Sequence, residues 1–312
     1  MTYFYSIKVL FSNFNLMWKQ LLYLVICSLL GFGLLYLIGR PILQALLEEG
    51  LIEKLYLIIK NFTFSFNLDK CFNSINELIG QFKEILNFSY INFKANTIWF
   101  IIVSVAIIPY IISLSNYSLS ECLYSHLSSN CKKPFTVAFI ENFFKNLLYT
   151  LLKLIIVIPF VILTCYIVKV TYLSFPSNEI FSLFAPIIIL IEIIALFTIL
   201  TVLTSCWLPI IVSHNKNVFV SFYYNLKVMV RNFGRVLSNS LMVVITLLAF
   251  NLIFGVFAFI ITVPISMLFI NCYNMILYFT STGTNFYADY DNIVKPKKVE
   301  ETIKVSDIKN LL

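Results

Sequence analysis

Charge is scarce in this sequence. Only 12% of the 312 residues are Asp, Glu, Lys or Arg, whereas roughly 25% is usual in soluble domains. So few charges cannot cover the surface of a water-soluble protein. Disorder is excluded as well, because 60% of the residues are hydrophobic and disordered chains have low hydrophobicity. Glycine occurs only 8 times, which excludes a collagen-like fibre. The composition leaves an all-α polytopic membrane protein.

Motifs that carry chemistry are missing too. The chain has no GxxxxGKS/T phosphate loop, no HExxH zinc motif and no GxSxG nucleophile elbow. Its seven cysteines are scattered and imply no disulfide framework. Cys122, His126 and Cys131 do not have the spacing of a structural zinc site, which needs four ligands. We therefore expect no enzymatic activity, no catalytic residue, no cofactor and no metal.

Long apolar runs are what the sequence has in abundance. A spanning helix needs about 20 mostly apolar residues. Six segments meet this length: about 20–39, 97–115, 147–168, 182–212, 238–260 and 264–282. The last two belong to one apolar stretch, which as a single helix would be roughly 70 Å long and over twice the hydrocarbon thickness. We place the break at Thr262-Val263-Pro264 and the end of the first span at Arg40-Pro41, because proline interrupts helical hydrogen bonding. A re-entrant final segment is the alternative.

Basic residues predict the orientation. With the N-terminus inside, 14 Lys and Arg residues fall on inner segments and 7 on outer ones. Six of those seven lie in one long loop, about 40–96, where the positive-inside rule is weak. Both termini are therefore expected in the cytoplasm and the protein in the cell membrane. Residues 1–282 would form the transmembrane domain and 283–312 a cytoplasmic tail. Two helices, about 41–60 and 73–88, are expected within the outer loop.

An internal repeat is one interpretation of three Asn-Phe pairs. Asn13-Phe14, Asn142-Phe143 and Asn232-Phe233 each follow an amphipathic, aromatic-rich stretch and precede an odd-numbered span. Such stretches are typical of helices that lie in the headgroup layer. The pattern predicts an interfacial helix and two spans, used three times as parallel two-span repeats. The alternative is chance, because Asn and Phe are abundant and Asn61-Phe62 is a further pair.

Glu192 is the acidic residue that lies deep in a predicted span. It is about ten residues, or 15 Å, into the fourth span. A carboxylate at that depth must be protonated, partnered or facing water. The polar candidates to meet it are Asn251, Asn271 and Asn274, with Thr164 as a further one. A proton or cation relay is one interpretation, and a neutral Glu that joins helices by hydrogen bonding is the other.

The layout resembles a group of uncharacterised bacterial six-helix membrane proteins. That group is related to the membrane domain found attached to glycerophosphodiester phosphodiesterases. The resembling features are Asn13-Phe14 and Trp18 before the first span, the similar entries at Asn142 and Asn232, and the tail with Tyr287-Ala288-Asp289 and Pro296-Lys297-Lys298. The chain has no soluble phosphodiesterase domain, so the resemblance supplies no catalytic residue. It implies a membrane component of unknown role.

Two functions fit these observations best, and a lipid-modifying enzyme that uses the headgroup-level helices is a third with less support. The first is a non-enzymatic anchor, scaffold or accessory subunit, with the lipid bilayer and another membrane protein as its partners. The alternative is a small transporter or export permease with a pathway past Glu192. Nucleic acid is not expected as a partner, because the net charge of +7 is spread over short segments between the spans.

Overall fold

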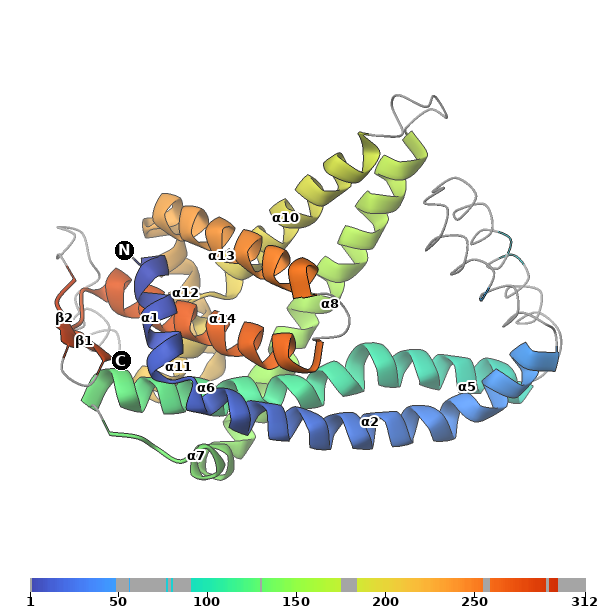
Figure 1. Cartoon of the computed structure of the whole chain (residues 1–312), viewed down its shortest axis with the longest axis horizontal. Coiled ribbons are helices and arrows are strands. Elements are labelled where there is room, and N and C mark those ends of the chain that lie inside the picture. Colours follow the sequence, from blue (N-terminus) through green and yellow to red (C-terminus); the bar gives the residue numbers. More distant parts are fainter. Residues whose placement is uncertain are drawn as a thin grey trace. The chain divides into compact units, whose positions relative to one another are not determined.

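The fold is that of an all-α polytopic membrane protein. The computed structural model describes residues 2–48, 56, 77, 80, 91–129, 131–174, 184–254, 259–289 and 292–296, and 88% of the structure is helical (Figure 1). In this part of the chain, six helical segments are long and apolar enough to cross a membrane. They are Asn15–Ile42, Ala95–Ser129, Phe143–Thr171, Ile187–His214, Phe233–Phe254 and Ile261–Thr282. The prediction of six spanning helices is therefore confirmed.

Short and long helices alternate along the chain. The helices are α1 (Thr2–Ser12), α2 (Asn15–Glu48), α5 (Ile91–Ile102), the π-helix η1 (Val103–Ile107), α6 (Ile108–Ser129), α7 (Phe135–Glu141), α8 (Phe143–Ser174), α10 (Ala185–Thr204), α11 (Trp207–His214), α12 (Val218–Arg231), α13 (Phe233–Phe254) and α14 (Phe259–Thr282). After α14 comes an antiparallel hairpin of two short strands, β1 (Phe286–Asp289) and β2 (Asn292–Val294).

Asparagine separates a short helix from a spanning helix at three places. Asn13 lies between α1 and α2, Asn142 between α7 and α8, and Asn232 between α12 and α13. The backbone of Asn142 (φ −111°, ψ 22°) nearly equals that of Asn232 (φ −115°, ψ 25°). Both asparagines have left the α-helical region, so the helix direction changes there. The predicted order of amphipathic helix, asparagine and span is present at all three places.

Two prolines do not end helices where the sequence suggested. Residues 259–282 form one helix, so no break lies at Thr262-Val263-Pro264, and Pro264 is inside α14. Pro264 has no N–H, so the Ile260 carbonyl four residues earlier loses its helical donor; spanning helices tolerate this where neighbouring helices, side chains or water satisfy the freed carbonyl. α14 is one helix of 24 residues rather than a re-entrant segment. Pro41 is likewise inside α2, which continues to Glu48.

Two compact units make up the chain. The first comprises Met1–Leu24 and Ile112–Leu312, and α14 is its central helix. In the most apolar stretch of α14, 67% of the residues are buried, against 22% or less in the other five spans. Helices α1, α11 and α13 pack against α14, and Figure 1 shows them around it. A helix that is apolar and buried on all sides forms the core of its unit.

The second unit, Val25–Ile111, packs through glycine. A Cβ atom on Gly31 would lie 3.2 Å from Cδ1 of Ile108, and one on Gly39 would lie 3.2 Å from Cε2 of Phe100. Both glycines are buried. Small residues of this kind let spanning helices approach closely without a hydrophobic driving force. The helices predicted for 41–60 and 73–88 fall largely outside the described residues, as does the tail after Pro296.

Candidate functional site

Polar side chains extend from α14 toward the helices around it. Backbone groups inside a helix already bond one another, so a buried polar side chain must find its partner on a neighbouring helix or one turn away. In α14 these side chains are two or five residues apart and fall on two sides of the helix, because an α-helix has 3.6 residues per turn. We call this set the α14 polar hub; it consists of Ser266, Asn271, Tyr273, Tyr278 and Thr280.

Asn271 is the most fully bonded member of the α14 polar hub. Its Oδ1 accepts a hydrogen bond from Ser120 (2.8 Å), and its Nδ2 donates to Oδ1 of Asn116 (2.9 Å) and to the Met267 carbonyl (2.8 Å). Asn116 and Ser120 are one turn apart on α6, so they lie on one face of that helix. Asn271 is 2% exposed. It joins α14 to α6 in the apolar interior.

Gln20 adds α2 to the same region. Its Nε2 donates to Oγ of Ser115 on α6 (2.7 Å) and to the sulfur of Met267 on α14 (3.3 Å). The side chain of Gln20 is fully buried. Three spanning helices therefore meet at uncharged polar groups, an arrangement that holds helices together in lipid.

The other members of the α14 polar hub bind α13, α11 and α1. The hydroxyl of Tyr273 lies 2.8 Å from Oγ of Ser240 on α13, and Nδ2 of Asn251 on the same helix donates to Ser266 (3.3 Å). The other two hydroxyls meet α11 and α1: Tyr278 OH lies 2.7 Å from Nε2 of His214, and Thr280 Oγ1 lies 3.4 Å from Thr2 Oγ1. Each surrounding helix therefore has its own polar contact with α14.

The fourth span is interrupted between α10 and α11, and Asn225 of α12 hydrogen-bonds the backbone at the interruption. α10 ends at Thr204 and α11 starts at Trp207, two residues before Pro209. Proline has no N–H, so the carbonyl four residues earlier, at Ser205, loses its helical donor. Asn225, which is fully buried, accepts a hydrogen bond from the Cys206 N–H (2.9 Å) and donates to the Leu203 carbonyl (2.6 Å).

Glu192 is bonded to α8 and not to the asparagines. Thr171 in the last turn of α8 donates to Oε1 of Glu192 (2.7 Å), while Oε2 is buried without a hydrogen-bond partner among the described residues. The side chain as a whole is half-buried. Because α10 begins at Ala185, Glu192 lies about 10 Å from its start. Glu192 is therefore nearer the N-terminal end of its span than the predicted 15 Å.

The structure does not bring the four sequence candidates together. Asn271 belongs to the α6 contact described above, and Asn251 bonds the Leu247 carbonyl besides Ser266. Asn274 is 8% exposed, and its Oδ1 has no hydrogen-bond partner in the described part of the chain. No hydrogen bond between described residues joins Glu192 to any of these asparagines. Thr164, the further candidate, donates to the Phe160 carbonyl of its own helix.

Sequence reasoning missed Thr171, Gln20 and Asn225. Thr171 is too common a residue in spans to attract notice, and its role depends on the pairing of α8 with α10. A signal did exist for Gln20 and Asn225, because an uncharged amide in an apolar segment needs a partner as much as a carboxylate does. It also existed in α6, where serine recurs at positions 115, 118 and 120.

A charged cluster lies where α6, α7 and α8 meet. Lys133, in the connection after α6, forms ion pairs with Glu121 and Glu141, and Nδ2 of Asn142 donates to Oε2 of Glu121 (2.7 Å). Partial burial lowers the pKa of Lys133, but the hydrogen bonds and charges of both glutamates outweigh it, so the pKa of Lys133 is raised above 10.5. Lys133 therefore stays charged at neutral pH. Through Glu121, which binds both Lys133 and Asn142, it helps to hold the junction of α7 and α8 against α6.

In the described part of the chain, His, Cys, Asp and Glu side chains form no group of three or more that could hold a metal ion.

Comparison with known proteins found no matching family model, no matching curated protein and no matching solved structure.

Proposed function

We propose that this chain is a non-enzymatic integral protein of the cell membrane that acts as a scaffold or accessory subunit of a membrane complex. The observation that carries the proposal is the α14 polar hub. A helix that is bonded to α6, α13, α11 and α1 resists the sliding and rotation of helices that alternating access requires. A rigid core of this kind suits a protein that positions another one. We also propose that both termini face the cytoplasm.

The exposed side of α8 supports the part of the proposal that concerns another membrane protein. None of the residues in the most apolar stretch of α8 is fully buried. Four side chains, each about half exposed or more, lie within a 60° sector of the helix: Leu151, Ile155, Ile162 and Tyr166. We call these residues the α8 stripe. An aromatic and apolar stripe along a whole span fits a second spanning helix as well as it fits lipid, so its occupant must be tested.

Photo-crosslinking in native membranes tests the proposal. A photoreactive amino acid is placed at Ile155 or Ile162 in the α8 stripe, and at Leu268 as a control, because Leu268 is fully buried in α14. We expect a protein adduct of the same mass from both stripe positions and none from Leu268. The adduct should persist in Glu192→Gln, since a scaffold does not need the carboxylate. Adducts with lipid alone at both stripe positions would refute the scaffold.

A small transporter remains the second candidate, and one observation favours it. Glu192 keeps a buried oxygen without a hydrogen-bond partner among the described residues, in the same span that is interrupted after Thr204. Interrupted spans line substrate sites in several transporter folds. The candidate predicts flux in proteoliposomes that Glu192→Gln abolishes and Thr171→Val reduces less, because Thr171 only orients the carboxylate. Equal flux with and without the carboxylate would reject a pathway past Glu192.

A further inference from the structure

Helix α1 has one face on the protein and one face away from it. Ser6 and Val9 are fully buried, where α1 packs on α14 and β1. Phe4 and Phe11 on the other face are each 69% exposed. Positions 4, 7, 8 and 11 follow helical spacing, so Ile7 and Lys8 share the outer face with the two rings. An amphipathic helix of this pattern is expected at a membrane surface.

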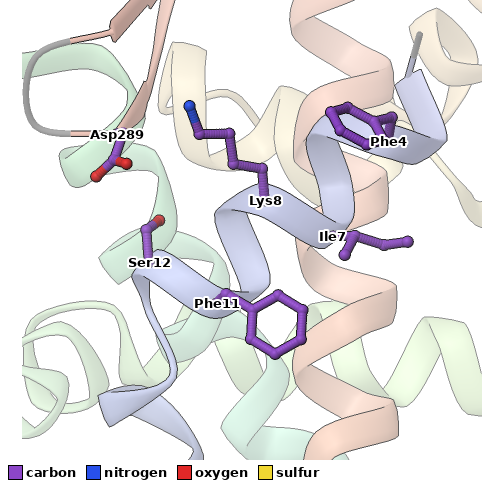
Figure 2. A pocket seen from close by; sticks show the side chains of 6 residues that line it. All are labelled: Phe4, Ile7, Lys8, Phe11, Ser12 and Asp289. Carbon is purple, nitrogen blue, oxygen red and sulfur yellow. The ribbon is translucent and has the colours of Figure 1, made fainter.

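A pocket of about 420 Å³ lies on this outer face (Figure 2). Its lining residues are Phe4, Ile7, Lys8, Phe11, Ser12 and Asp289. Figure 2 shows Ser12 next to Asp289 of β1, with Lys8 on the same side; the Phe11 ring projects from α1 close to Ser12, and Phe4 lies at the other end of the helix. The volume falls within the roughly 300–1,000 Å³ that is usual for small-ligand sites. The pocket therefore has a polar end and an apolar wall.

The position of the pocket in the chain places it at headgroup level. α1 ends just before Asn15, where the first span begins, and Asp289 follows shortly after Thr282, where the sixth span ends. Because an even number of spans lies between them, both borders are on the same face of the membrane. The polar headgroup layer lies directly outside the hydrocarbon core. Phospholipid headgroups are therefore the molecules that surround this pocket.

The charges of the pocket select among phospholipids. Lys8 forms no ion pair with another described residue, and its ammonium suits a lipid phosphate. Asp289 supplies a carboxylate that repels a second negative group and attracts an amine. A primary ammonium can also donate hydrogen bonds to Asp289 and to the hydroxyl of Ser12, which a trimethylated amine cannot do. Phe4, Ile7 and Phe11 offer contact to the glycerol and acyl portions.

We propose that this pocket binds phosphatidylethanolamine, with Lys8 on the phosphate, Asp289 on the primary ammonium and the phenylalanine rings along the acyl chains. One bound lipid would then contact both α1, which precedes the first span, and β1, which follows the sixth span. This site is independent of the scaffold proposal, because it concerns a different surface and a different ligand.

Native mass spectrometry of the purified, delipidated full-length chain tests the site. The probes are phosphatidylethanolamine, phosphatidylcholine and phosphatidylglycerol, added separately with identical acyl chains. We expect the ethanolamine lipid to bind at least about five-fold more tightly than either of the others, a factor that corresponds to roughly 1 kcal/mol for one charge contact at the surface. Equal affinity for all three lipids would overturn the proposal.

Matched variants separate the two charges. Lys8→Gln should weaken the binding of the ethanolamine and the glycerol lipid alike, since both carry the phosphate. Asp289→Asn should abolish the preference between them, and Lys8→Arg should restore binding. Lys227→Gln on α12 is the control, because Lys227 is an exposed lysine on another amphipathic helix. It should leave binding unchanged. A preference that survives Asp289→Asn contradicts the assignment.

Free phosphoethanolamine distinguishes a lipid from a soluble ligand. It carries the same phosphate and ammonium but cannot contact the phenylalanine rings with acyl chains. In excess it should displace little of the bound lipid, and Phe11→Ala should weaken lipid binding. Full displacement by the free headgroup would show that the pocket takes a small polar molecule instead, and the lipid assignment would fall.

Discussion

At the scale of single residues, two asparagines on α14 show that buried amides differ in how many hydrogen-bond partners they have. Asn271 and Asn274 are three positions apart, and both are nearly inaccessible. Asn271 makes three hydrogen bonds, while Oδ1 of Asn274 makes none with a described residue. A buried amide that is bonded stabilises the helix pair, and one that lacks a partner costs free energy. The identity of the residue does not reveal which case applies.

This contrast predicts opposite effects of one substitution. Asn271→Leu leaves Ser120 and Asn116 without their partner and should lower the free energy of unfolding by about 1–3 kcal/mol. Asn274→Leu removes an oxygen that has no partner among the described residues, so it should be neutral or slightly stabilising. Thermal unfolding of the purified protein in detergent measures both. An equal loss in the two variants would mean that Asn274 has a partner, and the α14 polar hub would need to include it.

Glu192 shows what the sequence can predict about the candidate site and what it cannot. A carboxylate within an apolar run is visible in the sequence because its desolvation is expensive anywhere in lipid. The partner is not visible, since it depends on which helices pack together and at what height. Thr171 meets Glu192 because α8 packs against α10 and both are near the ends of their spans. Two of the asparagines that looked equally suitable have other partners: Asn271 bonds α6, and Asn251 bonds Ser266 of α14.

At the scale of elements, the helix boundaries divide into two classes. Boundaries set by an asparagine were predictable, since Asn232 leaves the helix and bonds the Val228 carbonyl through both its backbone N–H (3.1 Å) and its Nδ2 (3.2 Å). Asn13 does the same with Val9 (3.1 Å for each bond). The helix ends predicted at Pro41 and Pro264 were wrong. A spanning helix continues past a proline where neighbouring helices, side chains or water satisfy the carbonyl that loses its hydrogen bond.

Close packing by glycine supplies a prediction at this scale. Gly31→Leu should destabilise the α2–α6 contact by about 1–3 kcal/mol, because its Cβ alone would lie 3.2 Å from Cδ1 of Ile108 and the Ile108 side chain would have to shift. Gly33→Leu is the matched control, since nothing lies within 4 Å of a Cβ there. It should be neutral or slightly stabilising, because leucine is the better helix former. Unfolding midpoints in detergent compare the two. Equal midpoints for both variants would show that Gly31 is not a packing site.

At the scale of the whole molecule, burial is unevenly distributed over the spans. α14 is buried on most of its surface, and the apolar stretch of α8 has no buried residue. The sequence predicted all six spans because crossing hydrocarbon imposes a length and an apolar composition on each. It did not predict that the last span is the central one. Lipid and protein interior are equally apolar, so hydropathy does not distinguish a core helix from a peripheral one.

Two native cysteines allow the orientation of the whole chain to be tested without new residues. Cys71 belongs to the segment between the first and second spans, and Cys131 is exposed between α6 and α7. Six spans with 14 Lys and Arg on one side and 7 on the other predict that Cys131 faces the cytoplasm and Cys71 the outside. Among the described cysteines, Cys165 is also exposed, but it lies within α8, where lipid suppresses the thiolate that a maleimide requires.

A membrane-impermeant maleimide applied to intact cells should therefore label the protein, and Cys71→Ser should abolish this labelling. After permeabilisation the labelling should increase, and Cys131→Ser should remove the increase. The positive-inside rule gives the reason, since short loops rich in Lys and Arg are retained on the cytoplasmic side. Labelling in intact cells that depends on Cys131 would invert the molecule. The termini, the α1 pocket and the Lys133 cluster would then all face outward, because an even number of spans fixes them to one side together.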